Sequence, residues 1–461
     1  MFAKEIYVKR REELKKSLGS GLVLLLGNGE ASLNYPDNTY TFRQDSSFIY
    51  YVGLDTPDLA YVLDVDNDQE YLFGDELTID DIIWMGNLPS LQARASQAGI
   101  ETVRPSADLS QMIRENKKRT IHYLKPHRYR NLLMLSESFG KKTDEIKESF
   151  SVELTQAIVE MRLIKSPVEL IELEDAGKIG YAMHITAMKM CRPGVKEQEI
   201  AGMIEGLAIS KGNRVSFATI LSMNGQTLHN HDHSGTLESG RLMLCDAGAE
   251  NNNYYASDFT RTTAVGGNYS KRQKDIHNIV LQALNESIEM AKPGITYKEV
   301  HRNAYRVIFE GLRDLGLVTG NTEEALNAGV PGLFMPHGLG HAMGLDVHDM
   351  EDLGENLVGY TNEIQRDTLF GYRSLRFGRC LKPGHVITVE PGIYFVPQLI
   401  EKWKAEKMHT DFIHYDKLSD FYDFGGIRLE DDIVITDSGC RLVYEKRLPV
   451  TVEEIQQAVS E

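Results

Sequence analysis

Apolar and polar stretches alternate along the first part of the chain in a way that predicts short helices and strands. A charged helical pattern covers residues 4–18, and the apolar run at residues 21–26 predicts a buried strand. Further short runs rich in β-branched and aromatic residues predict strands at residues 48–52, 60–65, 70–73 and 121–124. Strands that alternate with helices predict an α/β domain with a mixed sheet.

A different pattern begins near residue 150. A helix is predicted at residues 151–165, and the tetrapeptide Ser-Pro-Val-Glu at 166–169 then supplies the capping residue, the first-turn proline and the acidic partner of a capping box. The chain has 461 residues, which is too long for one ordinary core. We therefore expect two domains, residues 1–155 and residues 156–461.

An internal repeat lies in the second of these domains. The sequence Met-Cys-Arg-Pro-Gly-Val-Lys-Glu-Gln-Glu-Ile at residues 190–200 is matched by Met-Ala-Lys-Pro-Gly-Ile-Thr-Tyr-Lys-Glu-Val at residues 290–300. Each copy ends one predicted helix at Pro-Gly and begins another, and each helix pair leads into a strand region. The repeat predicts two duplicated halves with a cleft between them.

Composition and charge exclude several classes of protein. The chain is 42% hydrophobic and 25% charged, as is typical of a globular protein, and its formal charge of −17 argues against a nucleic-acid partner. The four cysteines form no Cys-x-x-Cys pair, so we expect free thiols and a reducing, cytoplasmic compartment. No apolar run reaches the length of a signal peptide or a membrane span, so we expect no membrane partner.

Carboxylates follow apolar runs in both predicted halves. Asp246 ends the run at residues 242–245, and Asp258 lies in the partner strand of a predicted hairpin. In the second half, Glu390 ends an apolar strand and Glu430 lies between β-prone stretches. Buried carboxylates that share a site repel one another, and a bound cation removes that repulsion.

The glycine-rich stretch at residues 336–349 contains three histidines, His337, His341 and His348. Its glycines allow the backbone to approach other groups closely, and histidine is the commonest side-chain metal ligand. Carboxylates with an imidazole suit two divalent ions, with manganese or magnesium favoured by oxygen ligands and cobalt, iron or zinc by nitrogen. The pattern predicts a site that holds two metal ions.

Taken in order, these motifs resemble the pita-bread metallopeptidases, in particular the aminopeptidase P and prolidase branch. The resemblance rests on Pro-His-Gly-Leu-Gly-His, Val-Glu-Pro-Gly-Ile-Tyr and Gly-Ile-Arg-Leu-Glu-Asp, and on Thr-Phe-Arg-Gln-Asp-Ser-Ser-Phe at residues 41–48. It implies a creatinase-like N-terminal α/β domain with a mixed sheet. It also implies an α+β pita-bread catalytic domain of two pseudo-symmetric halves.

The resemblance further implies a function and a set of site residues. The function is hydrolysis of the peptide bond preceding proline in Xaa-Pro dipeptides or short peptides by a dinuclear metal site, with manganese first among the candidate metals, in a homodimer. Asp258 and Glu430 resemble the bridging ligands, and Glu390 resembles a ligand that also handles the catalytic proton. The implied metal ligands are Asp246, Asp258, His341, Glu390 and Glu430. The implied catalytic and substrate-binding residues are His229, His337, His348, Arg376, Tyr394, Glu390 and Arg428.

Three questions stay open at this point. Arg376 falls where prolidases place an arginine that binds the carboxylate of a dipeptide, but the sequence does not separate a dipeptidase from an aminopeptidase. The interval from Asp246 to Asp258 is one residue longer than is usual in the family, and an extra residue within a strand would reverse the side chain of Asp258. The third question is whether the chain is instead a catalytically inactive pita-bread module that only binds peptides.

Overall fold

The structure is a computed structural model that describes all of residues 1–461, and its first compact unit is built on a five-stranded mixed sheet. The strand order is β6-β5-β4-β1-β7, with β1 parallel to β7, β5 parallel to β6 and the other pairs antiparallel. The strands are β1 (Leu22–Leu26), β4 (Ala60–Asp64), β5 (Gln69–Phe73), β6 (Thr102–Arg104) and β7 (Ile121–Tyr123). The predicted mixed sheet is confirmed.

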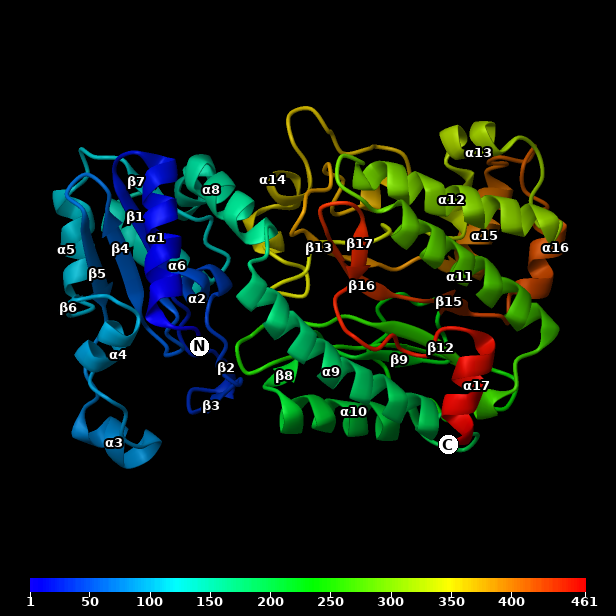
Figure 1. Cartoon of the computed structure of the whole chain (residues 1–461), viewed down its shortest axis with the longest axis horizontal. Helices are drawn as coiled ribbons and strands as arrows, with labels where there is room; N and C mark the ends of the chain where they lie inside the picture. The colour runs from blue at the N-terminus through cyan, green and yellow to red at the C-terminus, as the bar shows by residue number, and fades with distance from the viewer. The chain divides into compact units, whose positions relative to one another are not determined.

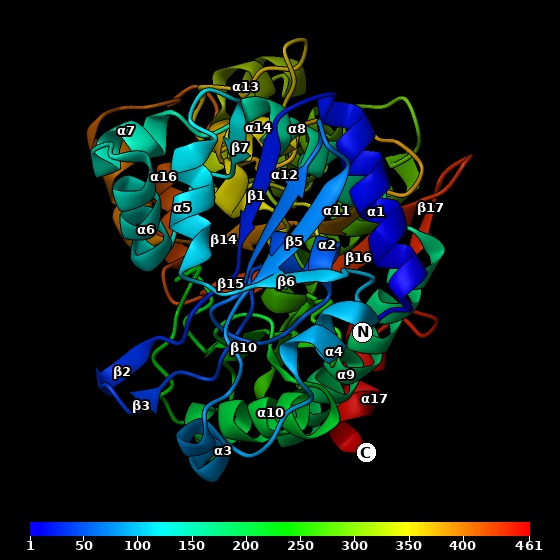
Figure 2. The ribbon, with the colours of Figure 1, turned by 90° about the vertical axis from the view of Figure 1, so that its left-hand side faces the viewer.

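Helices cover both faces of this sheet (Figure 2). Leu109, Met112, Leu132, Leu135 and Ile146 bring α5, α6 and α7 onto one face in a common apolar core, and α1 lies on the other face with α2. The helices are α1 (Lys4–Leu18), α2 (Ser46–Val52), α3 (Ile79–Met85), α4 (Leu91–Gln97), α5 (Asp108–Glu115), α6 (Tyr129–Phe139), α7 (Thr143–Glu148) and α8 (Val152–Leu163). A small hairpin, β2 (Ser32–Tyr35) and β3 (Asn38–Thr39), projects from the unit.

The strand predicted at residues 48–52 is wrong, because this segment is the helix α2. The Asp45 carboxylate accepts a hydrogen bond from the Phe48 backbone N–H at 2.8 Å, and Gly53 ends the helix at φ 70°. Every residue of α2 is buried. A helix buried on all sides has no amphipathic period, so its short aromatic run cannot be told from a strand by sequence.

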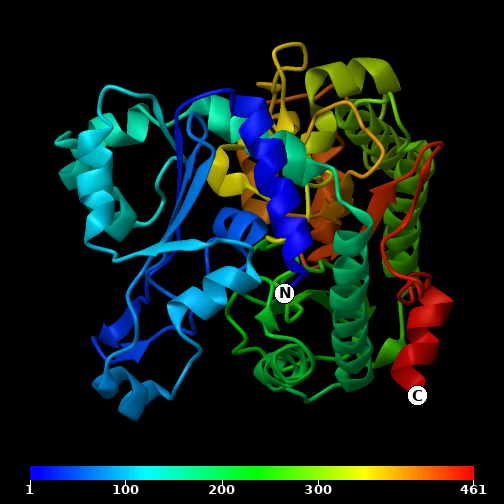
Figure 3. The same cartoon turned by 60° about the vertical axis from the view of Figure 1, so that its left-hand side comes forward.

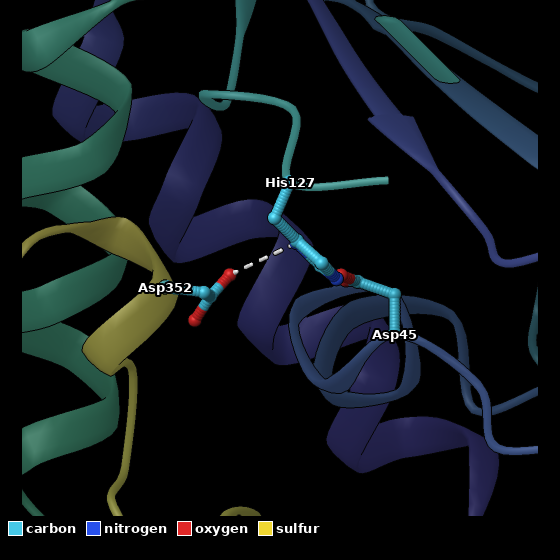
Figure 4. Close-up of side chains that lie close together, drawn as sticks. All are labelled: Asp45, His127 and Asp352. Carbon is cyan, nitrogen blue, oxygen red and sulfur yellow. Dashed lines mark ion pairs between the residues drawn. The ribbon is translucent and has the colours of Figure 1, made fainter. Parts of the chain in front are cut away.

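The first unit consists of Met1–Met161 together with Met350–Val358, a short segment from much later in the chain. Asp352 in that segment lies beside His127 and Asp45 (Figure 4), and His127 Nδ1 is 3.7 Å from Asp352 Oδ2. The side chains of His127 and Asp352 are 44% and 35% exposed, and Asp45 already caps α2. We therefore describe this group as a surface ion pair beside a helix cap.

The second unit, Arg162–Asp349 with Gly359–Glu461, contains the duplicated halves. In the first half, α9 (Pro167–Met190) and α10 (Glu197–Lys211) accompany the sheet β12-β10-β9, formed by β9 (Ile220–Ser222), β10 (Leu242–Asp246) and β12 (Thr260–Ala264). In the second half, α11 (Lys271–Met290) and α12 (Tyr297–Asp314) accompany β13-β16-β17, formed by β13 (Val386–Val389), β16 (Asp431–Ile435) and β17 (Cys440–Leu442). Within this unit the two helix pairs lie on opposite sides of the strands (Figure 1).

The Pro-Gly turns of the repeat have the same geometry in both halves. Gly194 and Gly294 have φ of 88° and 90°. Their backbone N–H groups donate to the carbonyls of Leu237 at 2.8 Å and Leu381 at 3.0 Å. The predicted duplication is therefore confirmed as a structural repeat.

Smaller elements complete the second unit. They are β8 (Arg214–Val215), β11 (Ala249–Glu250), β14 (Gly392–Tyr394), β15 (Gly426–Arg428), α13 (Thr322–Ala328), α15 (Pro397–Ala405), α16 (Tyr415–Leu418) and α17 (Val452–Ser460), while α14 (Glu355–Gly359) begins in the first unit. The C-terminal helix α17 packs beside α9 (Figure 3). No helix of the structure has the length and apolar character required to cross a bilayer.

Candidate metal centre and substrate cavity

A cavity of about 720 Å³ lies within the second unit. One part of its wall is apolar and includes Phe217, Ile220, Leu228 and Val347. The other part is polar. It includes all but one of the predicted site residues: His229, Asp246, Asp258, His337, His341, His348, Arg376, Glu390, Arg428 and Glu430. The exception is Tyr394, which does not line the cavity but contacts two residues that do.

The four carboxylates reach the cavity from equivalent places in the two halves. Asp246 is the last residue of β10, and Glu390 directly follows β13. Asp258 and Glu430 come just before β12 and β16, the strands that pair with β10 and β13. Each antiparallel pair thus presents two carboxylates at one end, which is what the hairpin argument from sequence predicts.

The hairpin between β10 and β12 also accommodates its extra residue. Asp246 pairs with Thr260, and the same register continues to Asn251, whose N–H donates to the Tyr255 carbonyl at 3.0 Å. The longer interval therefore lies at the tip, where Tyr254 adopts a φ of 69°. No bulge interrupts the ladder, so the side-chain direction of Asp258 is preserved.

Asp258, His341 and Glu430 form the tightest group in the cavity, with one ligand atom from each within 4.8 Å of the others. His341 Nε2 is 3.4 Å from Asp258 Oδ2 and 4.0 Å from Glu390 Oε1. His341 Nδ1 lies 3.1 Å from the Ala342 carbonyl, which can only accept, so Nδ1 carries the proton. The lone pair of Nε2 therefore faces the carboxylates.

Burial and mutual repulsion strongly perturb these carboxyl groups. Burial, followed by the charges of Asp246 and Asp432, raises the pKa of Asp258 well above its usual value. Burial, followed by the charge of Asp258, raises the pKa of Glu430 well above its usual value. A cation between the two would remove this repulsion and favour both charged forms.

Two buried oxygens in the cavity also have no hydrogen-bond partner, Oδ1 of Asp246 and Oδ1 of Asp258. Buried polar atoms are normally satisfied, and two unpaired carboxylate oxygens in the lining of one cavity are suited to bind a cation. Carboxylates with one imidazole are donors that hold divalent cations of the manganese, cobalt and zinc kind. The residues present therefore fit divalent metal.

A chain of hydrogen bonds supports the site from behind. Arg428 Nη2 donates to Asp246 Oδ2 at 2.5 Å, and Arg428 Nη1 donates to the Tyr394 hydroxyl at 2.7 Å. His337 Nδ1 faces the Gly338 carbonyl at 2.8 Å, so His337 Nε2 accepts from the Tyr394 hydroxyl at 2.9 Å. Burial, followed by the charge of Arg428, lowers the pKa of His337 to about 3. His337 is therefore neutral, and both of its ring nitrogens are bonded within the chain.

Two further residues, one lining the cavity and one behind its wall, were not identified from the sequence. His231 lines the wall beside His229, and its Nδ1 faces the Thr219 carbonyl at 3.4 Å. Asp432 is fully buried, and its Oδ2 accepts a hydrogen bond from the Asp258 N–H at 3.2 Å. The pair of histidines in Leu-His-Asn-His was the available signal for His231. Nothing in the local sequence indicates that Asp432, rather than its neighbour Asp431, contacts the site.

An α/β domain together with a two-halved unit that buries a carboxylate–histidine cavity is the arrangement expected of a metallopeptidase of the pita-bread class. Residues 172–437 match the family model described as metallopeptidase family M24, and residues 7–122 match the model described as aminopeptidase P, N-terminal domain. The chain belongs to metallopeptidase family M24. The predicted family and fold class are confirmed.

Relatives and solved structures agree with this assignment. Human Xaa-Pro dipeptidase is 32% identical, with 97% of this chain and 91% of the relative covered. A probable Xaa-Pro aminopeptidase of Sordaria macrospora is 30% identical, with 95% and 92% covered. Aminopeptidase P from E. coli with the inhibitor Pro-Leu superposes with a TM-score of 0.81 at 28% identity, with 100% of this chain and 98% of that chain covered. A zinc-substituted form in complex with product gives a TM-score of 0.82 at 27% identity.

Proposed function

We propose that this metallopeptidase hydrolyses the peptide bond preceding proline in short Xaa-Pro peptides. One observation carries the proposal: five candidate metal ligands and three further histidines converge on one cavity that also has an apolar wall. The names of the relatives, Xaa-Pro dipeptidase and Xaa-Pro aminopeptidase, support the same substrate class. In this proposal the domain of residues 156–461 carries catalysis, and the domain of residues 1–155 does not contribute side chains to the cavity.

We assign Asp246, Asp258, His341, Glu390 and Glu430 as the ligands of two divalent cations. Manganese is our first choice because oxygen donors outnumber nitrogen in the set. Cobalt, zinc, iron and magnesium are the alternatives, and a zinc-substituted form of the E. coli relative is known. When bound, the metals supply Lewis acidity and lower the pKa of water at the scissile carbonyl.

The chain's own residues bind and orient the peptide. His229 and His348 line the cavity and can donate to the peptide carbonyl groups, while Phe217, Ile220 and Val347 receive apolar side chains. The Glu390 carboxyl lines the cavity with Oε1 4.0 Å from His341 Nε2, so it can take up and return a proton during bond cleavage. Arg428 and Tyr394 keep Asp246 and His337 in place through the hydrogen bonds described above.

Arg376 is our candidate for recognition of the substrate's C-terminus. It lines the cavity, and burial lowers the pKa of its guanidinium, which is the signature of a cation held partly out of water. An arginine fork matches a carboxylate in bidentate fashion. We therefore propose Xaa-Pro dipeptidase as the principal activity, with the dipeptide carboxylate on Arg376.

Aminopeptidase activity on longer peptides is the second candidate, favoured by the likeness to aminopeptidase P over the whole chain. The test compares Gly-Pro with Gly-Pro-Ala, using metal-stripped protein restored with manganese. Cleavage of Gly-Pro alone supports the dipeptidase, and release of glycine from both supports the aminopeptidase. Cleavage of neither supports the inactive peptide-binding module and overturns the proposal.

The Arg376→Ala variant sharpens this test. If Arg376 binds the dipeptide carboxylate, the change raises KM for Gly-Pro by about 10- to 100-fold, as expected for one lost charged hydrogen-bonded pair. The KM for an amidated dipeptide, Gly-Pro-NH2, is unchanged because it has no carboxylate to lose. Equal effects on both substrates would refute the assignment of Arg376.

We also propose that the protein is a cytoplasmic homodimer. All four cysteines are free, which suits a reducing compartment.

The dimer is inferred from an exposed apolar surface. The helix α3 carries Ile79, Ile83, Trp84 and Met85 with 69%, 68%, 83% and 76% of their surfaces exposed. An exposed apolar group of this kind is typical of a surface that a second copy covers. Light scattering of the wild type and of Trp84→Asp tests the dimer, since only the wild type should give the dimer mass.

A further inference from the structure

A buried group of three charges lies next to the histidine-rich stretch but outside the cavity. Asp349 Oδ1 accepts from Arg162 Nη2 at 2.7 Å, and Asp349 Oδ2 accepts from Lys165 Nζ at 2.8 Å. The side chains of Arg162, Lys165 and Asp349 are only 2%, 1% and 1% exposed. Three fully buried charges are rare in a protein unless they are paired, and we call this group the Asp349 triad.

The triad also contacts the middle of the tight loop that follows the metal ligand His341. Arg162 Nη2 also contacts Asp346 Oδ2 at 3.2 Å, and the Asp346 N–H donates to Asp349 Oδ1 at 3.3 Å. A Cβ atom on Gly344 would lie 2.5 Å from Asp349 Oδ2 and 2.9 Å from Lys165 Cε. Only glycine at this position lets the lysine and the aspartate meet.

The loop leads back to the metal ligand through one carbonyl. The oxygen of Ala342 accepts the Asp349 N–H at 2.9 Å, and the same oxygen faces His341 Nδ1 at 3.1 Å. A carbonyl has two lone pairs and can accept both donors. Asp349 therefore holds in place the acceptor that keeps the proton on His341 Nδ1 and leaves Nε2 free for metal.

The loop also sets the position of the next histidine. His348 directly precedes Asp349, and its ring centroid is 3.9 Å from that of His341. The two rings therefore depend on the same short segment, residues 342–349. A shift of Asp349 would move both the metal ligand and the histidine assigned to the peptide.

We propose that the Asp349 triad is a positioning device, in which Arg162 and Lys165 hold Asp349 so that His341 and His348 keep their orientation in the site. The proposal rests on the role of His341 as a metal ligand, as given under the proposed function. Partners that orient a metal-ligating histidine through its second nitrogen typically change metal affinity or activity 10- to 100-fold when they are lost. Arg162 and Lys165 act through Asp349, so neither is a catalytic residue.

The electrostatics of the triad agree with a fixed charge. Burial by itself raises the pKa of Asp349, but the Lys165 ammonium and the Arg162 guanidinium lower it below its usual value. Lys165 Nζ is itself oriented, since it also donates to the Arg162 carbonyl at 2.6 Å. Asp349 is thus a permanent anion with two oriented donors, which is a rigid support for the loop.

The test uses Lys165→Met in the full-length protein and measures manganese binding to the metal-stripped form by calorimetry. We expect the Kd for manganese to rise by about 10- to 100-fold, and kcat on Gly-Pro at saturating manganese to fall by about tenfold. Lys165→Arg, which keeps the charge, should recover part of both. A control, Arg119→Gln, breaks the pair of Arg119 with Asp64 in the first unit and should leave both quantities unchanged.

A second variant and a second measurement distinguish a positioning role of the triad from a purely structural one. If Lys165→Met does not fold, Lys165→Gln retains a donor for Asp349 without the charge and takes its place. Histidine-selective ¹⁵N spectra of the metal-free protein should show that the proton of His341 is confined to Nδ1 in the wild type but exchanges between Nδ1 and Nε2 in the variant. A lower melting temperature with unchanged Kd, kcat and His341 spectrum would overturn the proposal. Normal manganese binding by the wild type without cleavage of Gly-Pro would instead count against the substrate assignment alone.

Discussion

At the scale of single residues, the neighbours of a buried carboxyl group decide its state. Asp258 and Asp349 are both buried, yet burial and the nearby carboxylates raise the pKa of Asp258, while two cations bring the pKa of Asp349 below its usual value. Asp349 is therefore a satisfied structural anion. Asp258 has an unpaired oxygen and neighbours of its own charge, so it requires a cation to be stable in the charged form.

The first prediction concerns His341, whose Nε2 faces Asp258 and Glu390. His341→Ala removes this nitrogen, so we expect loss of bound metal and no detectable cleavage of Gly-Pro, with unchanged circular dichroism. Metal content by elemental analysis and kcat/KM are the measurements. Asp423→Asn, at an exposed ion pair with Arg272, is the control and should behave as wild type. Wild-type activity of His341→Ala with normal metal content would refute the ligand assignment.

The second prediction concerns His277, a fully buried histidine outside the cavity. Burial lowers the pKa of His277 to about 4 from an ordinary value of 6.5. Between these values only the unfolded chain binds the proton, so stability is lost as the pH falls from 6.5 toward 4, by about 1.4 kcal/mol per pH unit.

His277→Gln removes this proton-binding difference, so the variant should lose less stability than the wild type when the pH is lowered from 7 to 5. Urea unfolding at the two pH values measures the change. The control is the same substitution at the exposed His414, which should leave the wild-type pH dependence intact. An identical pH dependence for His277→Gln would refute the argument.

At the scale of elements, two antiparallel strand pairs with the same arrangement carry the four carboxylates of the candidate metal site. β10 with β12 and β13 with β16 each place one carboxylate after the first strand and one before the second. The constant register of the β10–β12 pair requires close backbone contact at Gly248, where a Cβ atom would lie 1.8 Å from the Ser257 carbonyl oxygen. The spacing of Asp246 and Asp258 therefore depends on a glycine between them.

The third prediction follows from this contact. Gly248→Ala forces the two chains of the hairpin apart, so we expect a loss of several kcal/mol of stability or at least a tenfold weaker Kd for manganese. Gly202→Ala on the exposed side of α10 is the matched control, because a Cβ there meets nothing within 4 Å. It should raise stability by about 0.5–1 kcal/mol. Thermal unfolding and calorimetric metal titration measure both variants.

At the scale of the whole molecule, all assigned site residues belong to the second compact unit, while the first has its own sheet and apolar core. If the proposed metal ions bind there, the stability of the second unit depends on them. Asp258 and Glu430 have pKa values raised well above the usual range when no metal is bound. Such groups stabilise the metal-free fold only at low pH, and their contribution is lost as the pH rises through their folded pKa values.

The fourth prediction is that metal stabilises the protein more at high pH than at low pH. Manganese at 100 times its Kd should add about 2.7 kcal/mol of stability for each site. Calorimetric scans with manganese and with chelator, at pH 6 and at pH 8.5, measure the difference in melting temperature. A gain at pH 8.5 that is no larger than at pH 6 would show that the carboxylates do not bind the metal as charged groups.

The sequence by itself determined the local features whose causes lie within a few residues. The helix over residues 4–18, the capping box at Ser166 and the strand-end positions of Asp246 and Glu390 all follow from apolar period, capping chemistry and the end of an apolar run. The ordered motifs also indicated the family. These features were predictable because short-range sterics and hydrogen bonding decide them.

Only the tertiary structure decided which distant groups meet. Sequence could not show that α2 is buried on every side, that the segment Met350–Val358 joins the first unit, or that Arg162 and Lys165 converge on Asp349. It also could not decide where the extra residue of the hairpin lies. Packing and long-range pairing decide these points. The residues that neighbour a charged or apolar side chain in sequence do not show which distant groups it contacts in the fold.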